Sequence, residues 1–393
     1  MAAIQCILGA AFSIVPPVLP LMLPGMGIHD SAALRIWAGA ILGAAPLAAA
    51  MTSPTWGRIS DRLDRRLIIL MSCVAAGTST ALMCFATHPL ELLALRLAMG
   101  FFGGHVAASM AIVSAATPTG RMGYALGFMA TAQLAGTLIG PLLGGVIADA
   151  FHSFRAPFFG AAVAAVMVAG LMMRVPARAA AAAAAAAAAL GADAVPEPSG
   201  QRRREPRLSR DIWLWIGVLL LCQWAILCPQ PMISLFVLQL VGPRSDLATL
   251  AGVAFSIVAL SGLICAPLLG VLGDAIGARR VLLIGVLGAA ACNFSQGFAH
   301  HYGLFVLERF CAGLFLAGII PTANSLLAHH SAAENRGRIY GLSAASTFHG
   351  GFMGPVSGGA LAAVLGLRSV FIASAGLLAL AAAMISSRAQ PRR

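Results

Sequence analysis

The sequence predicts an all-α, polytopic membrane protein with twelve transmembrane helices in two pseudo-symmetric six-helix bundles. Three observations lead to this fold class. Of the 393 residues, 60% are hydrophobic and only 10% are charged, the apolar residues form long continuous runs, and the second half of the chain repeats the first. A soluble chain could not bury this much apolar surface, which argues against a soluble enzyme, a nucleic-acid-binding domain or a disordered chain. Continuous rather than alternating runs argue against a β-barrel.

The apolar runs define the expected helices in order, and each has about the 20 residues that cross a bilayer. In the first bundle, expected over residues 1–175, the runs cover 2–24, 32–54, 67–87, 90–113, 122–148 and 156–175. In the second bundle, expected over 212–393, they cover 212–237, 247–269, 280–299, 302–328, 338–363 and 367–387. The first run lacks a basic segment before it, so we interpret it as a span rather than a cleaved signal peptide.

Residues 176–211 between the two sets have the composition of a cytoplasmic low-complexity linker. The segment contains eleven consecutive alanines, Ala179 to Ala189, followed by a stretch rich in Pro, Glu and Arg. A helix of eleven residues is only about 16 Å long, too short to cross the hydrocarbon core. We therefore expect a tether between the bundles rather than a thirteenth span.

The net charge of +12 comes entirely from arginine, and its placement predicts the membrane orientation. The arginines concentrate in alternate loops and at the C-terminus, the pattern of the positive-inside rule. These clusters contain Arg58, Arg62, Arg65 and Arg66, then Arg174, Arg178, Arg202, Arg203, Arg204, Arg207 and Arg210, then Arg279 and Arg280, Arg336 and Arg338, and Arg388, Arg392 and Arg393. We expect both termini and the central linker in the cytoplasm, with a bacterial-type inner membrane as the location.

The repeat between the halves has an offset of 213 or 214 residues. Its matched positions are Gly57, Asp61 and Arg66 with Gly270, Asp274 and Arg279, Pro16 with Pro229, Arg96 with Arg309, and Gly136, Gly140, Pro141, Gly144 and Gly145 with Gly350, Gly354, Pro355, Gly358 and Gly359. So long a period indicates a duplicated bundle rather than a solenoid. Parallel repeats of this kind place a substrate site at the midplane between the halves.

Two of the repeated motifs are candidates for the machinery of switching. The loop after the second span carries Gly57, Asp61, Arg62, Arg65 and Arg66. The Asp61 carboxylate can pair with an arginine or cap a neighbouring helix. The glycines and proline of the fifth span allow close helix contact and a bend. The alternatives are an ordinary positive-inside loop and ordinary transmembrane packing.

These motifs resemble the major facilitator superfamily, in which the loop pattern G-x-x-x-D-R-x-G-R-K is a signature with a weaker echo in the second half. The run from Gly136 to Gly145 is similar to the antiporter signature of the twelve-helix drug:proton antiporter branch. Shorter stretches resemble MdtG-like bacterial multidrug exporters; these are 35–39, 54–58, 121–127 and 155–159. The sequence departs from the branch in having Asp64 where the loop motif has Gly, and no acidic residue in the first helix.

The resemblance implies that Arg96, inside the fourth span, takes part in proton coupling. Buried charge in a span is expensive and is usually functional, although a long side chain can also snorkel to the interface. With no carboxylate in the first helix, we rank Glu308 first as the proton carrier, then His105 and Asp61. Glu308 is the one carboxylate expected inside a span, and histidine titrates near working pH.

Polar side chains on the expected cavity helices are candidates for substrate contact. They are Gln133, Gln223, Trp224, Gln230, Asn324 and Thr347. A large apolar pocket with a few polar anchors suits varied lipophilic ligands. The alternative, which is the commoner role of a single such residue, is a hydrogen bond that holds two helices together.

The resulting expectation is a secondary active transporter that exports small lipophilic or amphipathic compounds in exchange for protons, as a monomer in the lipid bilayer. The alternatives are a transporter of one specific metabolite (a sugar, siderophore or amino-acid derivative) and, remotely, a membrane sensor or intramembrane enzyme. The sequence has no G-x-x-x-x-G-K-[ST] phosphate-binding loop and no HExxH zinc motif. We therefore expect no cofactor, metal or nucleic-acid partner, with the proton gradient as the energy source.

Overall fold

The computed structural model describes residues 1–60, 65–102, 109, 112–113, 117, 122–173, 210–329 and 336–387. Asp61, Arg62, His105 and the alanine run lie outside these residues, as do the side chains of Arg65, Arg66 and Asp274. The described chain is helical throughout, so the predicted all-α fold class is confirmed.

Six helices form the first half of the described chain. They are α1 (Ala2–Met22), α2 (Ser31–Ser60), α3 (Arg65–Met83), α4 (Pro89–Phe101), α6 (Met122–Ala150) and α7 (Ala156–Met173), with a short 3₁₀ turn η1 (Leu23–Met26) after α1. All six overlap the apolar runs predicted for the first bundle. The helices α2 and α6 have 30 and 29 residues, more than the roughly 20 that cross a bilayer.

The second half repeats this order with two interruptions. Its elements are α9 (Arg210–Leu227), η3 (Gln230–Met232), α10 (Ile233–Val241), α11 (Leu247–Ile276), α12 (Ala278–Gln296), α13 (Tyr302–Leu316), α14 (Ile319–His329), α15 (Arg336–Leu365) and α16 (Ser369–Ser386). The seventh span breaks at Pro229 and Pro231, because proline supplies no backbone N–H to the helix. The tenth span breaks between Leu316 and Ile319.

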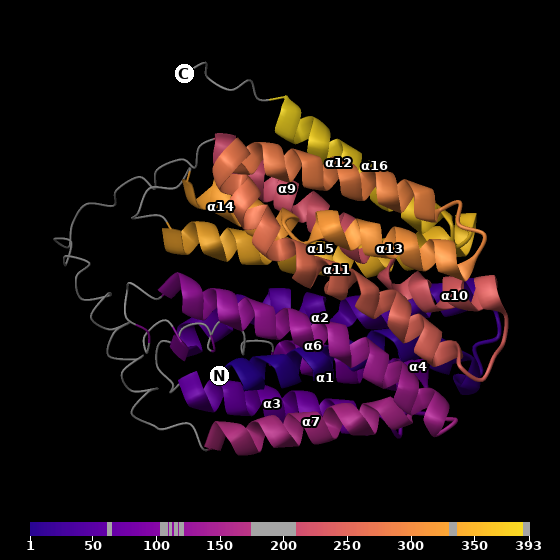
Figure 1. Ribbon diagram of the computed structural model, residues 1–393. Helices are drawn as coiled ribbons and strands as arrows, with labels where there is room; N and C mark the ends of the chain where they lie inside the picture. Colours follow the sequence, from indigo (N-terminus) through magenta and orange to yellow (C-terminus); the bar gives the residue numbers. More distant parts are fainter. Residues whose placement is uncertain are drawn as a thin grey trace.

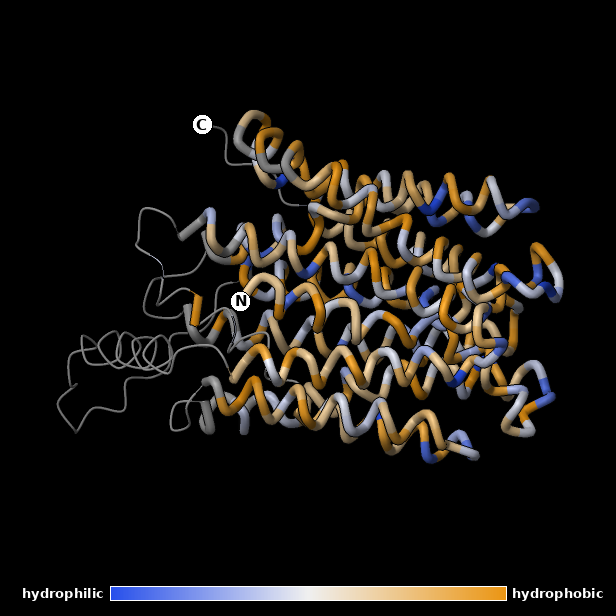
Figure 2. Tube along the Cα trace, turned by 60° about the horizontal axis from the view of Figure 1, so that its bottom comes forward, coloured by the Kyte–Doolittle hydropathy of each residue, from blue (hydrophilic) through white to orange (hydrophobic). Residues whose placement is uncertain are grey.

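Nine helical segments of the described chain are long and apolar enough to cross a membrane, counting α9–α10 and α13–α14 as one segment each. Adding α3, α4 and α15 gives six segments in each half. Many large apolar side chains along these helices are exposed, including Val163, Val166 and Val271. Figure 2 shows hydrophobic residues along the length of the helices and hydrophilic residues mainly at their ends, the distribution expected of helices in lipid.

The bundle has two ends, which we name by the residues they hold. The terminal end holds the start of α1 and the ends of α2, α7 and α16, and the distal end holds the short turns at 23–30, 84–88, 150–155, 242–246, 297–301 and 366–368. At the terminal end, Gly277 joins α11 to α12 with φ +89°, a conformation that favours glycine. The two halves form two layers of helices in Figure 1.

The buried core divides in the same way. One apolar cluster includes Val18, Phe158, Phe236 and Phe305 and draws residues from both halves, with most of its members toward the distal end. Two further clusters lie toward the terminal end; one contains described residues of the first half only and the other of the second half only. The halves therefore share a core at the distal end and keep separate cores at the terminal end.

Candidate transport pathway

The glycines of α6 place this helix in direct backbone contact with α1. A Cβ at Gly136 or Gly140 would overlap α1 backbone atoms, and at Gly144 it would lie 2.6 Å from the Ile14 carbonyl oxygen. Such distances leave no room for a side chain. These three glycines, spaced four residues apart, therefore form one face of α6 and pack it within its own half.

The other face of α6 contacts the opposite half. Gly145 lies against the Ala248 backbone of α11, and Gly252 of α11 lies against the Pro141 carbonyl. The Ser256 hydroxyl donates a hydrogen bond to the Leu138 carbonyl at 2.6 Å. One helix thus carries two contact surfaces, one inside its half and one between the halves.

The helix α15 repeats both surfaces in the second half. Gly350 and Gly354 lie against α9, Gly358 lies against the Cys228 backbone directly after α9, and Gly359 lies against the Arg35 backbone of α2. Gly39 of α2, which matches Gly252 in the repeat, packs on the Pro355 carbonyl. The junction between the halves is consequently two-fold pseudo-symmetric and consists of small residues at both helix pairs.

Two charged side chains add polar contacts to this junction at the distal end. Asp149 at the end of α6 accepts hydrogen bonds from the Ala248 and Thr249 N–H groups, at 3.2 and 2.6 Å. These N–H groups belong to the first turn of α11, where the helix dipole favours an anion. On the other side, Arg35 of α2 donates to the Ala362 carbonyl in the last turn of α15 at 2.8 Å, where a cation is favoured.

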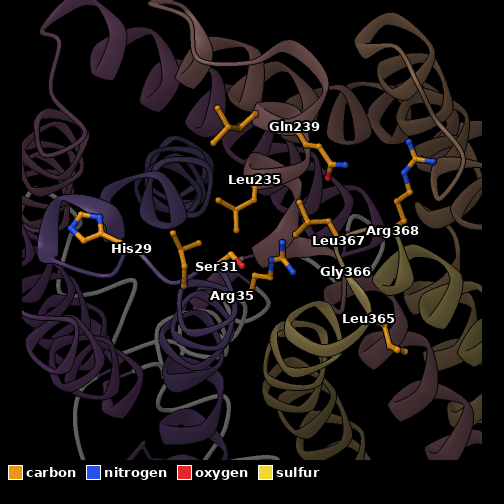
Figure 3. A pocket seen from close by; sticks show the side chains of 11 residues that line it. His29, Ser31, Arg35, Leu235, Gln239, Leu365, Gly366, Leu367 and Arg368 are labelled. Atoms are coloured by element: carbon orange, nitrogen blue, oxygen red, sulfur yellow. The ribbon is translucent and has the colours of Figure 1, made fainter.

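A cavity of about 550 Å³ lies over this second contact at the distal end. It is lined by residues of α2, α10 and the turn between α15 and α16, and Figure 3 shows the Arg35 side chain between Ser31 and Leu367. Arg368 on its rim donates to the Ala299 carbonyl at 3.4 Å. The arginines of this cavity are thus engaged with backbone carbonyls of the second half.

A second cavity, of about 520 Å³, lies between the halves, and we call it the central cavity. It is bounded by α1 and α6 from the first half and by α9, η3, α10, α11, α13 and α14 from the second. Its lining residues are Ser13, Pro16, Leu134, Thr137, Pro141, Gln223, Ile226, Leu227, Gln230, Ile233, Phe255, Val258, Ala259, Gly262, Arg309, Gly313, Leu316, Ala317, Ile320 and Pro321. The surface is mainly apolar with few polar groups, as in sites for small organic ligands.

The polar residues predicted for substrate contact lie in different places. Gln223 and Gln230 line the central cavity. Gln133 instead bonds to Gln5 of α1 at 2.5 Å, and the Trp224 indole donates to the Ser357 hydroxyl at 2.8 Å. Each of these two bonds links neighbouring helices within a single half, the first half for Gln133 and the second half for Trp224.

Two of the predicted contacts lie in the second half near the terminal end. Asn324 of α14 accepts a hydrogen bond from Ser343 of α15 at 2.6 Å. The Thr347 hydroxyl donates to the Ser343 carbonyl of its own helix at 3.0 Å. Neither residue lines either of the cavities described above.

The repeated arginines differ in what they face. Arg96 is 5% exposed, and within the part of the chain that the structure describes its buried Nε and Nη2 atoms have no hydrogen-bond partner. Arg309 is 9% exposed, donates from Nε to the Ala254 carbonyl at 3.1 Å, and lines the central cavity. Sequence analysis did not choose Arg309 as a site residue, although its match to Arg96 was the available signal.

Glu308, ranked first as the proton carrier, lies at the contact of α12 with α13. It accepts a hydrogen bond from the Ser295 hydroxyl, and its buried Oε2 atom has no hydrogen-bond partner among the described residues. It does not line the central cavity, because adjacent helix residues point in different directions. Arg96 and Glu308 therefore belong to opposite halves, and the structure does not bring them together.

The candidate switching loop is described only at its flanks. Gly57 lies in α2 and Gly270 in α11, each in the last turns before the end of its helix. Arg279 at the start of α12 donates to the Ile385 carbonyl of α16 at 2.6 Å. This bond ties two helices of the second half together at the terminal end.

Comparison with known proteins gives one consistent answer. The profile of the Major Facilitator Superfamily matches residues 1–244 and 231–393. The multidrug resistance protein MdtG of Dickeya zeae is 31% identical over 370 residues, which cover 94% of this chain and 88% of that protein. MdtG of Salmonella typhi is 29% identical over 94% of this chain and 89% of the relative.

Solved structures share the fold at lower sequence identity. The human organic anion transporter TETRAN superposes with a TM-score of 0.68 at 19% identity, covering 98% of this chain and 97% of the other. A bacterial homologue of the human lysosomal transporter Spinster gives 0.71 at 14% identity, with 99% and 98% coverage. With the profile matching both halves and the fold agreeing, the chain belongs to the major facilitator superfamily and is a multi-pass membrane transporter, not an enzyme.

Proposed function

We propose that this transporter exports small lipophilic or amphipathic compounds in exchange for protons, by alternating access. The observation that carries the proposal is the central cavity between two halves that share a core only toward one end. Alternating access requires a state in which the site is open toward one end of the bundle and closed by a junction at the other end. The relatives named multidrug resistance protein support export of more than one compound.

We further propose that the terminal end faces the cytoplasm of a bacterial-type inner membrane. The arginine clusters of the sequence adjoin the helix ends at this side, as the positive-inside rule requires. The conformer is then inward-facing, closed at its outer end by the distal junction. The protein acts as a monomer in this proposal, since each chain holds a complete cavity.

Proton coupling is the part of the proposal that rests on individual residues. Arg96 modulates the carrier group, and Glu308, His105 and Asp61 are the candidate carriers. The buried, unpartnered oxygen of Glu308 supports it as a group that holds a proton inside the membrane. The loop around Asp61, with its echo in the second half, governs the switch between the two states.

The test is a panel of structurally unrelated antibiotics and dyes in a pump-deficient bacterium, combined with everted membrane vesicles. Expression should raise resistance to several compounds, and each of them should collapse an imposed pH gradient in the vesicles. Glu308→Gln, His105→Gln and Arg96→Ala then test the coupling residues one at a time. If only one compound class responds, the chain is a specific metabolite transporter; flux without any effect on the gradient contradicts proton coupling.

The switching loop has its own expected result. Asp61→Asn should abolish flux while substrate still binds, because the charge acts on the conformational change and not on the ligand. Binding to purified protein and flux in vesicles are measured on the same preparation. Normal flux in Asp61→Asn removes the loop from the mechanism.

A further inference from the structure

We infer that Arg309 is the substrate-recognition residue of the central cavity and that the preferred substrates are amphipathic anions, with a carboxylate or sulfonate on an apolar body. This inference rests on the proposed function, since it names the chemistry of the compounds that the cavity accepts.

The first step is the charge of the cavity. Among the described residues that line it, Arg309 is the one charged side chain. The remaining polar side chains are Ser13, Thr137, Gln223 and Gln230, all neutral. A cation within a membrane span is stabilised by an opposite charge or by several carbonyl groups. The cavity therefore has an excess positive charge that an anionic ligand neutralises.

The second step is the hydrogen-bonding capacity of the guanidinium group. It carries five N–H donors in a planar fork that matches a carboxylate or a similar oxyanion. The Nε donor is engaged with the Ala254 carbonyl at 3.1 Å, which fixes the side chain from the α11 side. The adjacent acid Glu308 offers no pairing within the cavity, because it is bonded to Ser295 on α12.

The third step is the rigidity of the helix that carries Arg309. One turn further along α13, Gly313 packs on α11 so closely that a Cβ would lie 2.9 Å from the Val258 Cα. The arginine is thus held on a tightly packed helix pair rather than on a loop. Fixed donors on a rigid scaffold recognise a ligand at a lower cost in conformational entropy than mobile ones.

The fourth step is the asymmetry between the halves. Arg96 occupies the matching position of the repeat and is equally buried, yet it does not line the central cavity. The first half contributes to the described lining only neutral side chains, from α1 and α6. Anion recognition is consequently a property of the second half alone.

The experiment compares two fluorescent probes that differ in one charged group. 1-Anilinonaphthalene-8-sulfonate is the anion, and N-phenyl-1-naphthylamine is its neutral counterpart without the sulfonate. Binding is measured on purified protein in lipid nanodiscs, with empty nanodiscs subtracted. Arg309→Gln should raise the Kd of the anion by about tenfold, the size of one lost charged hydrogen bond, and leave the neutral probe within about twofold.

Two further variants and one further probe sharpen the test. Arg309→Lys keeps the charge and should recover part of the anion affinity, which a purely structural arginine would not predict. Arg244→Gln removes an exposed arginine that pairs with Asp246 away from the cavity, and should bind both probes as wild type does. Tetraphenylphosphonium, a lipophilic cation, should bind Arg309→Gln more tightly than wild type.

The inference is overturned if Arg309→Gln binds the anion as wild type does, if it weakens both probes equally, or if wild type prefers the cation. Gel filtration and thermal unfolding show whether the Gln variant is folded; if it is not, the wild-type ranking of the three probes decides. Binding requires no pH gradient, so loss of proton-driven flux with intact anion selectivity contradicts the proposed function and leaves this inference standing.

Discussion

Asp149 and Arg35 close the distal end with opposite chemistry, one an anion at a helix start and the other a cation at a helix end. The α11 helix has its own acidic N-cap residue, Asp246, but this residue makes no side-chain capping bond and pairs with Arg244 instead. Capping of α11 is therefore supplied by the opposite half. A bond that normally stabilises one helix here stabilises one state of the whole transporter.

Replacing Asp149 by alanine should favour opening of the distal end. Loss of a helix cap costs about 1 kcal/mol, which changes a two-state ratio by about fivefold. Spin labels at the exposed positions Thr87 and His301, one on each half, report the distance in a background without native cysteines. The longer distance should gain population in Asp149→Ala. The matched control is Asp246→Ala, which removes an acid that caps no N–H group.

A distance distribution that is identical in Asp149→Ala and wild type would show that the small-residue contacts alone hold the distal end. Equal shifts in both alanine variants would point instead to a general effect of negative charge at this end. The two substitutions remove the same functional group within one junction, so the comparison isolates the contact between the halves.

At the scale of single residues, the sequence did not indicate which of its polar candidates line the central cavity. Gln223 and Gln230 line it, whereas Gln133 and Asn324 bond to side chains on neighbouring helices. A polar residue in an apolar run must find some partner, and one helix alone does not reveal whether that partner is a ligand or another helix. Arg309 illustrates this limit, because its place in the sequence does not reveal that its side chain bonds to α11 and lines the central cavity.

At the scale of elements, one face of α6 packs within the first half, and the other face contacts the second half at the junction that we expect to open and close. Gly140 packs on α1 within one half, and Gly145 packs on α11 across the junction. A leucine at Gly145 should hold the two halves apart at the distal end and lower flux, because overpacking costs about 1–3 kcal/mol. A leucine at Gly140 should act within the first half and lower its thermal stability.

The control on the same helix is Gly127→Leu, since nothing lies within 4 Å of a Cβ at Gly127. Flux in proteoliposomes and thermal unfolding are measured for all three variants. Gly127→Leu should match wild type in both. Wild-type flux in Gly145→Leu would show that the α6–α11 contact is not part of the closed state.

The helices that sequence analysis did not anticipate are those interrupted inside the membrane. The seventh and tenth runs read as continuous spans, but the structure breaks them between α9 and α10 and between α13 and α14. Pro229 and Pro231 were visible signals for the first break. The second break lies at Ala317 and Gly318, where the apolar pattern continues and gives no signal; in the structure Gly318 packs against the Leu269 side chain of α11.

At the scale of the whole molecule, the two halves share an apolar core toward the distal end. The apolar periodicity and the repeat predicted this two-bundle architecture, because lipid-spanning segments must be helical and a duplicated sequence folds twice. The conformational state was not predictable in this way. Both open and closed states satisfy the same apolar pattern, and their difference lies in a few contacts at helix ends.

The linker should therefore tolerate replacement of its sequence. Exchanging Ala179–Ala189 for a Gly/Ser segment of equal length should leave flux in vesicles unchanged, since a flexible tether of the same length keeps the halves equally close. The amount of protein in the vesicle membranes and its thermal unfolding serve as controls. Loss of flux at normal expression would assign a structural role to the alanine run and contradict the expectation of a passive tether.

A single buried arginine in the central cavity also has an electrical consequence. The empty cavity carries the positive charge of Arg309, whereas a cavity holding a monovalent anion is neutral. The field across the membrane falls mainly over the closed side. The substrate-free carrier, which returns with a proton in the proposed exchange, therefore moves positive charge when it switches, and the anion-loaded carrier does not. At about 2.3 kcal/mol per charge for each 100 mV, the return step should depend on membrane potential while the export step should not.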